Sequence, residues 1–285
     1  MKQVLVTGVN GQLGQYLKEL SEVNSDIKFT FLGSHELDIT NQTNVKRLFE
    51  NNDFDYCINC AAYTAVDAAE GNLEKAYKVN VDGVVNLVNA CKQSETVLIH
   101  ISTDFVFDGN TPEPYTETDA TYPLSVYGQT KLEGEERIKA ILDNYFIFRT
   151  SWLYSEYGNN FMKTMLRLGQ ERTELSVVGD QIGTPTYAKD LAQVILKVVT
   201  EDNEEYGIYH YSNEGEVSWY DFAKEIFSLA NCNVRLNKIT TSEYPTSAKR
   251  PQYSVLSKDK IVSKINVKIP NWKDSLKQAL EHIKK

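Results

Sequence analysis

Hydrophobic and polar positions follow two periods over the first 150 residues of this 285-residue chain. Short apolar runs, which predict buried strands, alternate with stretches in which apolar residues recur every three or four positions, as on one face of a helix. The predicted strands are residues 3–7, 29–32, 56–61, 97–102 and 145–149, and the predicted helices are residues 13–21, 42–51, 74–94 and 127–142. This alternation predicts an α/β fold in which helices cover both faces of a doubly wound parallel sheet.

The regular alternation ends near residue 150. Loops rich in aromatic and polar residues follow, and Ser218 stands where it caps one of the later helices. The helices predicted in this part are residues 161–169, 188–200, 219–230 and 271–284. We therefore expect residues 1–150 to form one domain and residues 151–285 to form mainly a smaller, substrate-binding domain, with some later segments returning to the sheet.

A glycine-rich turn joins the first predicted strand to the first predicted helix. Gly8, Gly11 and Gly14 have the spacing G-x-x-G-x-x-G. In dinucleotide-binding folds the first glycine allows a tight turn, the second lets the backbone approach a pyrophosphate, and the third lets the helix pack closely on the strand. The helix N-terminus then offers free N–H groups to the phosphates. Residues 1–150 are therefore predicted to form a Rossmann-type, dinucleotide-binding domain.

The end of the second predicted strand bears on the choice of cofactor. Folds that bind NAD usually place an Asp or Glu there to hold the ribose 2′-OH. Residues 32–35 are Leu-Gly-Ser-His, with neither a carboxylate nor an arginine. This favours NADPH, or the use of both NADPH and NADH. Asp38 follows, where it either meets the adenine or caps the helix that starts near Asn41.

Tyr127 and Lys131 are the strongest candidates for catalysis. Their spacing of four places both side chains on one face of a helix, about one turn apart. A lysine ammonium near a phenol favours the phenolate, so we expect Lys131 to lower the pKa of Tyr127 from about 10 and to let it pass a proton near neutral pH. Alone, a Tyr-x-x-x-Lys match is weak evidence, but here the segment 102–104 (Ser-Thr-Asp) precedes it by about 25 residues.

Composition and charge narrow the class of protein. A formal net charge of −9 disfavours a nucleic-acid partner, and no apolar run approaches the roughly 20 residues of a membrane span. The first residues predict a strand and lack the layout of a signal peptide. Cys57 and Cys60 have C-x-x-C spacing, but they lie in a predicted buried strand, and no second pair or nearby histidine completes a metal site. We expect reduced cysteines and a cytoplasmic protein.

With these motifs in this order, the chain resembles the extended short-chain dehydrogenase/reductase family. That family has T-G-x-x-G-x-x-G near its N-terminus, a Ser or Thr ahead of a tyrosine, and Y-x-x-x-K. Within it, the chain is similar to the dTDP-4-dehydrorhamnose reductases. The segments that carry this similarity span nearly the whole chain: residues 60–67, 102–109, 126–131, 149–152, 158–161 and 250–251.

The resemblance implies a reaction and its cofactor. The expected activity is reduction of the C4 ketone of dTDP-6-deoxy-L-lyxo-4-hexulose by NADPH or NADH, which gives dTDP-L-rhamnose, a precursor of cell-surface polysaccharide. Tyr127 is expected to protonate the ketone oxygen and Thr103 to align the oxygen with the phenol. Lys131 is expected to lower the pKa of the phenol and to bind the nicotinamide ribose. No metal is expected to be required.

The resemblance also implies binding residues. Besides Tyr127 and Lys131, those expected to bind the cofactor are Gly8, Asn10, Gly11, Gln12, Leu13, Gly14, Asp38, Ile39, Ala61, Ala62 and Tyr63. Those expected to bind the nucleotide sugar are Thr103, Asp104, Trp152 and Arg250. Three of them have structural alternatives, which are core packing for Trp152, turn capping for Asp104 and a solvated surface position for Arg250.

Other functions stay open at this point. A nucleotide-sugar 4,6-dehydratase typically has Thr-Asp-Glu, and Phe105 cannot donate the proton that elimination needs. A 4-epimerase can use the same tyrosine and lysine, and a reductase can act on another dTDP-4-keto-deoxysugar. The regulatory subunit of methionine adenosyltransferase shares the resemblance without being an enzyme. Residues 186–189 form no acidic cluster and the helix from Asn271 carries several lysines, so we expect a monomer or at most a weak dimer.

Overall fold

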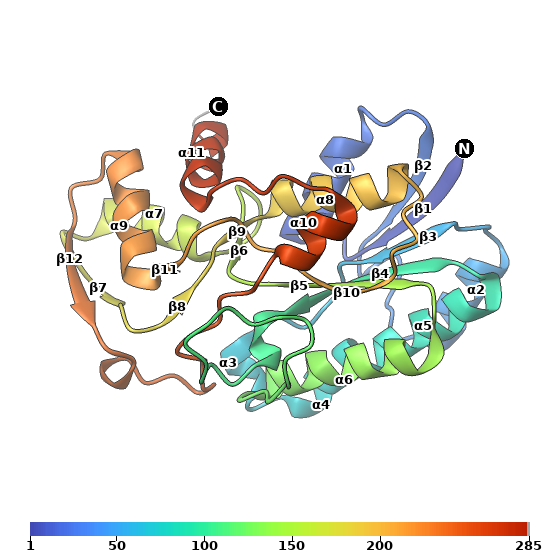
Figure 1. Cartoon of the computed structure of the whole chain (residues 1–285), viewed down its shortest axis with the longest axis horizontal. Coiled ribbons are helices and arrows are strands. Elements are labelled where there is room, and N and C mark those ends of the chain that lie inside the picture. Colours follow the sequence, from blue (N-terminus) through green and yellow to red (C-terminus); the bar gives the residue numbers. More distant parts are fainter. Residues whose placement is uncertain (284–285) are drawn as a thin grey trace.

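The computed structural model describes residues 1–283 and has a six-stranded sheet at its centre, in the order β10-β5-β4-β3-β1-β2 (Figure 1). These strands are β1 (Lys2–Thr7), β2 (Ile27–Leu32), β3 (Tyr56–Asn59), β4 (Val97–Thr103), β5 (Tyr145–Thr150) and β10 (Gly207–His210). Every neighbouring pair is parallel, so all six carboxyl ends lie at one edge. The strand order reverses between β1 and β3, which is where open α/β sheets bind ligands.

Helices cover both faces of this sheet (Figure 1). On one face lie α1 (Gln12–Ser21) and α8 (Ala188–Thr200), and on the other lie α2 (Gln42–Glu50), α5 (Gly83–Ser94) and α6 (Val126–Ile141). Alternate residues of β1 enter different cores, since Val4 and Val6 pack in one hydrophobic cluster and Leu5 in the other. The prediction of a doubly wound α/β sheet is confirmed.

The long helix predicted at residues 74–94 is interrupted. A π-helical turn, η1 (Lys78–Asp82), separates α4 (Leu73–Tyr77) from α5. Inside this turn, the buried Asn80 side chain accepts the Tyr63 N–H at 2.9 Å and donates to the Thr130 hydroxyl at 3.1 Å. π-helical turns are frequent at functional sites. This one ties the loop after β3 to α6.

Most residues after 150 form a smaller body beside the sheet (Figure 1). Its elements are β6 (Leu153–Tyr154), α7 (Phe161–Glu171), β7 (Glu174–Val178), β8 (Ile182–Gly183), β9 (Thr186–Tyr187), β11 (Val217–Ser218), α9 (Trp219–Ala230), β12 (Arg235–Ile239) and α11 (Trp272–Ile283). Ser218 caps α9 as predicted, because its hydroxyl accepts the Asp221 N–H at 3.0 Å. The last helix was predicted to reach Lys284, which lies outside the described residues.

Two later segments, β10 and α8, join the sheet and its helical cover. The remaining short elements are α3 (Val66–Ala69), η2 (Asp104–Val106), η3 (Thr241–Glu243) and α10 (Asp259–Ile265). None of the helices in residues 1–283 has the length and apolar character that crossing a membrane requires.

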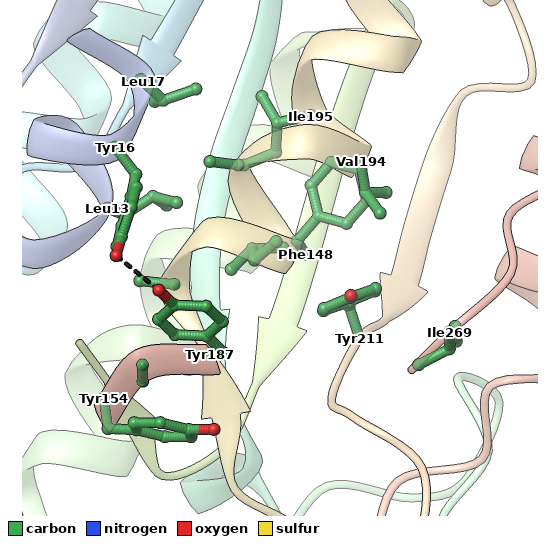
Figure 2. Close-up of a cluster of buried hydrophobic side chains, with 14 of the residues drawn as sticks. Leu13, Tyr16, Leu17, Phe148, Tyr154, Tyr187, Val194, Ile195, Tyr211 and Ile269 are labelled. Atoms are coloured by element: carbon green, nitrogen blue, oxygen red, sulfur yellow. Dashed lines mark hydrogen bonds between the residues drawn. The ribbon is translucent and has the colours of Figure 1, made fainter. Parts of the chain in front are cut away.

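A buried cluster joins the first helix to these later segments (Figure 2). Leu13 of α1 and Ile195 of α8 belong to the same core. Beside them, the Tyr16 and Tyr187 hydroxyls lie 2.6 Å apart, and both donate to the Glu156 carboxylate. The N-terminal helix is therefore held by residues from the second half of the chain.

Candidate active site

The glycine turn after β1 has the geometry that the sequence predicts. Gly8 has a φ of +66°, and a Cβ there would lie 2.6 Å from Ala61 N. A Cβ on Gly14 would lie 2.6 Å from Val9 Cα, whereas one on Gly11 would meet only Gly8 O, at 3.4 Å. Gly11 is also the N-cap of α1, and no side chain caps it. The open side of Gly11 and the free N–H groups of the first turn therefore fit a pyrophosphate.

A carboxylate does stand at the end of β2, although residues 32–35 contain none. Glu36 turns back so that its Oε2 accepts the Gly33 N–H at 2.9 Å. The Asn10 amide reaches the same place, because a Cβ on Gly33 would lie 2.5 Å from Asn10 Nδ2. Glu36 lies one position after residues 32–35, where a carboxylate was sought. The three-residue spacing between Gly33 and Glu36 is the signal, because it lets the carboxylate accept a hydrogen bond from the turn.

Asp38 and Ile39 lie between β2 and α2. Asp38 Oδ1 accepts the Thr40 N–H at 2.9 Å, whereas α2 is capped by Asn41, whose side chain accepts the Asn44 N–H at 3.1 Å. The capping alternative for Asp38 is therefore wrong. Ile39 is buried, and its carbonyl oxygen is held by a hydrogen bond from a side chain of α5.

The loop after β3 lies next to the glycine turn. Thr7 at the end of β1 pairs with Asn59 at the end of β3. The Asn59 side chain accepts the Ala61 N–H at 3.1 Å, and Tyr63 is held by Asn80. Ala61, Ala62 and Tyr63 are half-buried. These contacts fix the loop at the point where the strand order reverses.

Thr103 and Tyr127 meet at the carboxyl end of β4. Thr103 is the last residue of this strand, and Tyr127 lies in the first turn of α6, whose N-cap is Ser125. The Thr103 hydroxyl acts to lower the pKa of the Tyr127 phenol, and the phenol ring packs edge-to-face on Phe105. Burial nevertheless raises the pKa of Tyr127 to about 12. The expected lowering of this pKa by Lys131 is therefore wrong.

The position of Lys131 gives the physical reason. Its side chain is buried, and its Nζ lies 3.0 Å from His100 Nε2 and donates to the Ile101 carbonyl oxygen at 2.6 Å. Burial lowers the pKa of Lys131 to about 8, with the charge of Glu135 opposing the shift. An amine that is engaged by β4 and close to losing its proton gives the phenol little help. No local pattern in the sequence points to His100.

Asp104 lies beside the tyrosine, and its side chain is buried. Oδ1 accepts the Thr103 hydroxyl at 3.1 Å, and Oδ2 has no hydrogen-bond partner among residues 1–283. Burial raises the pKa of Asp104 to about 6. The η2 turn is capped by Thr103, which accepts the Phe105 N–H at 3.2 Å, so the capping alternative for Asp104 is wrong. A buried, unpartnered carboxyl oxygen suits a ligand hydroxyl or N–H group.

Trp152 follows the end of β5, the neighbour of β4. Its φ of +45° lies in the left-handed region, a strained conformation for a non-glycine residue of the kind that clusters at functional sites. One ring face stacks on Trp219 with centroids 3.5 Å apart, and a Cβ on Gly183 would lie 2.7 Å from the same ring. Packing therefore holds Trp152 in place, while the residue stays half-buried.

Arg250 lies in the wall of a pocket with a volume of about 530 Å³. The pocket is lined by Asp108, Asn110, Leu124, Thr241, Tyr244, Pro245, Thr246, Ser247, Ala248, Lys249, Arg250 and Gln252. The guanidinium forms a two-point ion pair with Asp67 of α3, at 2.5 and 3.0 Å, and Asp67 also accepts the Ala248 N–H. The hydrogen bond from Arg250 lowers the pKa of Asp67. Arg250 is therefore not a freely solvated side chain.

The cysteines and acidic residues complete the inventory of reactive groups. All four cysteines are free, and Cys57 and Cys91 lie in the hydrophobic core. In the part of the chain that the structure describes, no three or more His, Cys, Asp or Glu side chains gather in a way that would hold a metal ion.

Comparison with known proteins adds to this geometry. The family model described as RmlD substrate binding domain matches residues 1–285. The chain is 45% identical to dTDP-4-dehydrorhamnose reductase of Aggregatibacter actinomycetemcomitans, over 97% of this chain and 98% of that protein. It is 38% identical to the spore coat polysaccharide biosynthesis protein SpsK of Bacillus subtilis, over 99% and 98%.

Among solved structures, dTDP-4-dehydrorhamnose reductase from Bacillus anthracis in complex with NADP is similar, with a TM-score of 0.95 and 42% identity. The match covers 99% of this chain and all of that one. Both the sequence and the fold are thus shared over their full length. The chain belongs to the RmlD family, that of the dTDP-4-dehydrorhamnose reductases.

Proposed function

We propose that this protein reduces the C4 ketone of dTDP-6-deoxy-L-lyxo-4-hexulose to give dTDP-L-rhamnose, using NADPH or NADH, in the synthesis of cell-surface polysaccharide. The observation that carries the proposal is the placement of Thr103, the last residue of β4, and Tyr127, whose ring packs on Phe105, at the carboxyl edge of the sheet. That edge also carries the glycine turn after β1. Membership of the RmlD family supports the same reaction.

The proposed cofactor site runs along this edge. The pyrophosphate is assigned to the glycine turn, the adenine to Asp38 and Ile39, and the nicotinamide ribose to Tyr127 and Lys131. The full set is Gly8, Asn10, Gly11, Gln12, Leu13, Gly14, Asp38, Ile39, Ala61, Ala62, Tyr63, Tyr127 and Lys131. The Glu36 carboxylate suits a free ribose 2′-OH, and the NADP in the Bacillus anthracis relative favours the phosphorylated form, so we propose that both cofactors serve.

Tyr127 is the proposed proton donor. When bound, the reduced nicotinamide supplies the hydride to C4. The raised pKa of about 12 keeps the phenol protonated at neutral pH, so the proton is in place before the reaction. Thr103 is proposed to align the phenol with the ketone oxygen, where negative charge builds.

Residues 151–285 are proposed to form mainly the substrate-binding side, together with the end of β4. Arg250 suits the diphosphate, because a guanidinium can bond two phosphate oxygens at once. Asp104 offers an unpartnered oxygen to a sugar hydroxyl. Trp152 is assigned a contact with the nucleotide sugar through the part of its ring that packing leaves open.

We also propose a cellular location and an oligomeric state for the protein. Four free cysteines suit a reducing compartment, so we place the protein in the cytoplasm. We propose a monomer, or at most a weak dimer, with no required metal. The net charge of −9 disfavours nucleic acid as a partner.

The test mixes purified protein with dTDP-6-deoxy-L-lyxo-4-hexulose and, separately, NADPH or NADH. Loss of reduced-nicotinamide absorbance is followed and the sugar product is identified. We expect stoichiometric consumption of the cofactor and formation of dTDP-L-rhamnose. Cofactor binding without consumption would redirect the search to a sister dTDP-4-keto-deoxysugar, and product formation without net consumption would indicate an epimerase.

A further inference from the structure

A buried chain of hydrogen bonds ends at Lys131 and crosses three strands of the sheet. The Asn59 Oδ1 accepts the Thr7 hydroxyl at 2.7 Å and the Ala61 N–H at 3.1 Å. Asn59 Nδ2 lies 3.1 Å from His100 Nδ1, and His100 Nε2 lies 3.0 Å from Lys131 Nζ. Thr7, Asn59, His100 and Lys131 are all buried.

A backbone N–H group determines which atoms donate and which accept in this series of hydrogen bonds. The Ala61 N–H can only donate, so the Asn59 atom that faces it must be the carbonyl oxygen. The other end of the amide is then the NH₂ group, which donates to His100 Nδ1. That nitrogen therefore carries no proton, and the single ring proton of the neutral imidazole lies on Nε2.

The proton on Nε2 points at Lys131 Nζ. A lysine ammonium has no lone pair, so the ammonium and the imidazole N–H would both be donors across 3.0 Å. An uncharged amine instead accepts the His100 proton with its lone pair and donates one of its own protons to the Ile101 carbonyl oxygen. This hydrogen-bond pattern is satisfied only by the uncharged amine.

We propose that His100 is a positioning residue that favours the uncharged form of Lys131, and that in mildly alkaline solution binding of the nicotinamide cofactor is coupled to the uptake of a proton by Lys131. The proton comes from water or buffer and forms a bond to the Nζ lone pair. The amine can then no longer accept from Nε2, so the contact with His100 opens and the ammonium is free to bond the ribose. This inference rests on the proposed cofactor site.

The other groups that face Lys131 are accounted for. Cys60, at the end of β3, is a neutral thiol because burial raises its pKa. Glu135, one turn further along α6, is held by Arg149 at 2.6 Å. Tyr127, one turn earlier, is neutral because its pKa is about 12. Burial lowers the pKa of His100 well below its usual range, so the imidazole does not take the proton itself.

The test is calorimetric titration of the protein with NADPH at about pH 8.5, in two buffers with different heats of ionisation. We expect wild-type protein to take up more than about half a proton per cofactor bound, because Lys131 with a pKa near 8 is mostly uncharged there. In His100→Gln the amide oxygen can accept from the ammonium, so Lys131 is already charged and the uptake falls at least about two-fold.

His210→Gln is the matched control. His210 is also a buried histidine of the sheet, on β10, and its Nδ1 bonds the Tyr115 carbonyl oxygen rather than a lysine. We expect this variant to keep the wild-type uptake. Normal NADPH binding with no proton uptake, or equal uptake in wild type and His100→Gln, would overturn the inference.

A second measurement uses the unmodified chain, so it does not depend on whether His100→Gln folds. Carbon-13 NMR of lysine-labelled protein follows the Cε signal of Lys131, which is assigned by its loss in Lys131→Met. We expect a titration midpoint near 8, and a midpoint near the ordinary value of about 10.4 would refute the uncharged amine. Failure of NADPH to bind at all would count against the proposed function instead.

Discussion

At the scale of single residues, Tyr127 is expected to supply the proton and little of the binding energy. Tyr127→Phe should therefore lower kcat by about 10²-fold or more, while the affinity for NADPH stays within a few-fold. Steady-state kinetics and cofactor titration measure the two quantities separately. Substantial turnover in this variant would mean that another group donates the proton.

Asp104 provides a prediction on stability. Its pKa is about 6 in the folded protein and about 3.9 in an unfolded chain, so the folded state binds more protons between these pH values and loses stability as the pH rises from 4 to 6. Asp104→Asn should raise the free energy of unfolding by about 1–3 kcal/mol at pH 7.5, with no gain near pH 4. Urea unfolding at both pH values measures the difference.

Asp108→Asn is the counterpart of opposite sign. The hydrogen bond from Tyr115 lowers the pKa of Asp108, so its carboxylate favours the folded state and the amide should destabilise it at neutral pH. A stabilised Asp108→Asn, or an Asp104→Asn effect that is independent of pH, would contradict the argument.

Residue roles could be predicted where they depend on local spacing. The one-turn separation of Tyr127 and Lys131, and the glycine turn at Gly8, are properties of a few consecutive residues. The pKa of Tyr127 could not be predicted, because it depends on which group hydrogen-bonds with the Lys131 amine. That partner is His100, and its place beside Lys131 follows from how α6 lies on β4.

At the scale of elements, the start of α6 is held against β4 by a close approach of backbone. A Cβ on Gly128 would lie 2.2 Å from the Phe105 carbonyl oxygen, which cannot move without disturbing the end of β4. Gly128→Ala should therefore shift the first turn of α6, lower kcat at least about ten-fold and destabilise the protein by about 1–3 kcal/mol. Kinetics and urea unfolding check both effects.

The chain offers a matched control for this substitution. Gly71 has nothing within 4 Å of the position its Cβ would take. Gly71→Ala should therefore change the free energy of unfolding by less than about 1 kcal/mol and leave kcat unaltered. Equal losses in the two alanine variants would show that the contact with Phe105 does not position Tyr127.

Helices and strands with a strong apolar period were predicted correctly, such as β4 and α8. The break at Lys78–Asp82 was not, because the apolar positions continue through a π-helical turn and only the contacts of Asn80 explain it. β10 was also not identified as a strand. Gly207–His210 is short and lies at the edge of the sheet, where pairing with β5 decides its conformation.

At the scale of the whole molecule, Glu156 connects distant parts of the chain. Its carboxylate accepts hydrogen bonds from Tyr16 of α1 and Tyr187 of β9, and His282 of α11 lies 3.2 Å from it. Glu156→Ala should lower the free energy of unfolding by about 2–3 kcal/mol, since two largely buried hydroxyls lose their acceptor. Glu156→Gln keeps an acceptor and should cost less.

Glu171→Ala is the control for this pair of variants. Glu171 forms an exposed ion pair with Arg167 at i,i+4, which contributes at most about 0.5 kcal/mol. The urea midpoint should therefore be highest for Glu171→Ala, lower for Glu156→Gln and lowest for Glu156→Ala. An unchanged midpoint for Glu156→Ala would show that the cluster does not join the two halves. Such contacts between residues far apart in sequence, like that of Asp67 with Arg250, are not visible in any local pattern.

The late arrival of β10 has a consequence for how the chain is made. Until Gly207–His210 has left the ribosome, β5 is an open edge with unpaired N–H and C=O groups, and α1 lacks the cover that α8 provides. The nascent chain therefore carries an unpaired sheet edge while the residues between Thr150 and Gly207 are synthesised. Contacts of this sequence separation fold slowly. We expect the yield of the protein in cells to depend more on chaperones that bind the sheet before β10 is added than on the stability of the final fold.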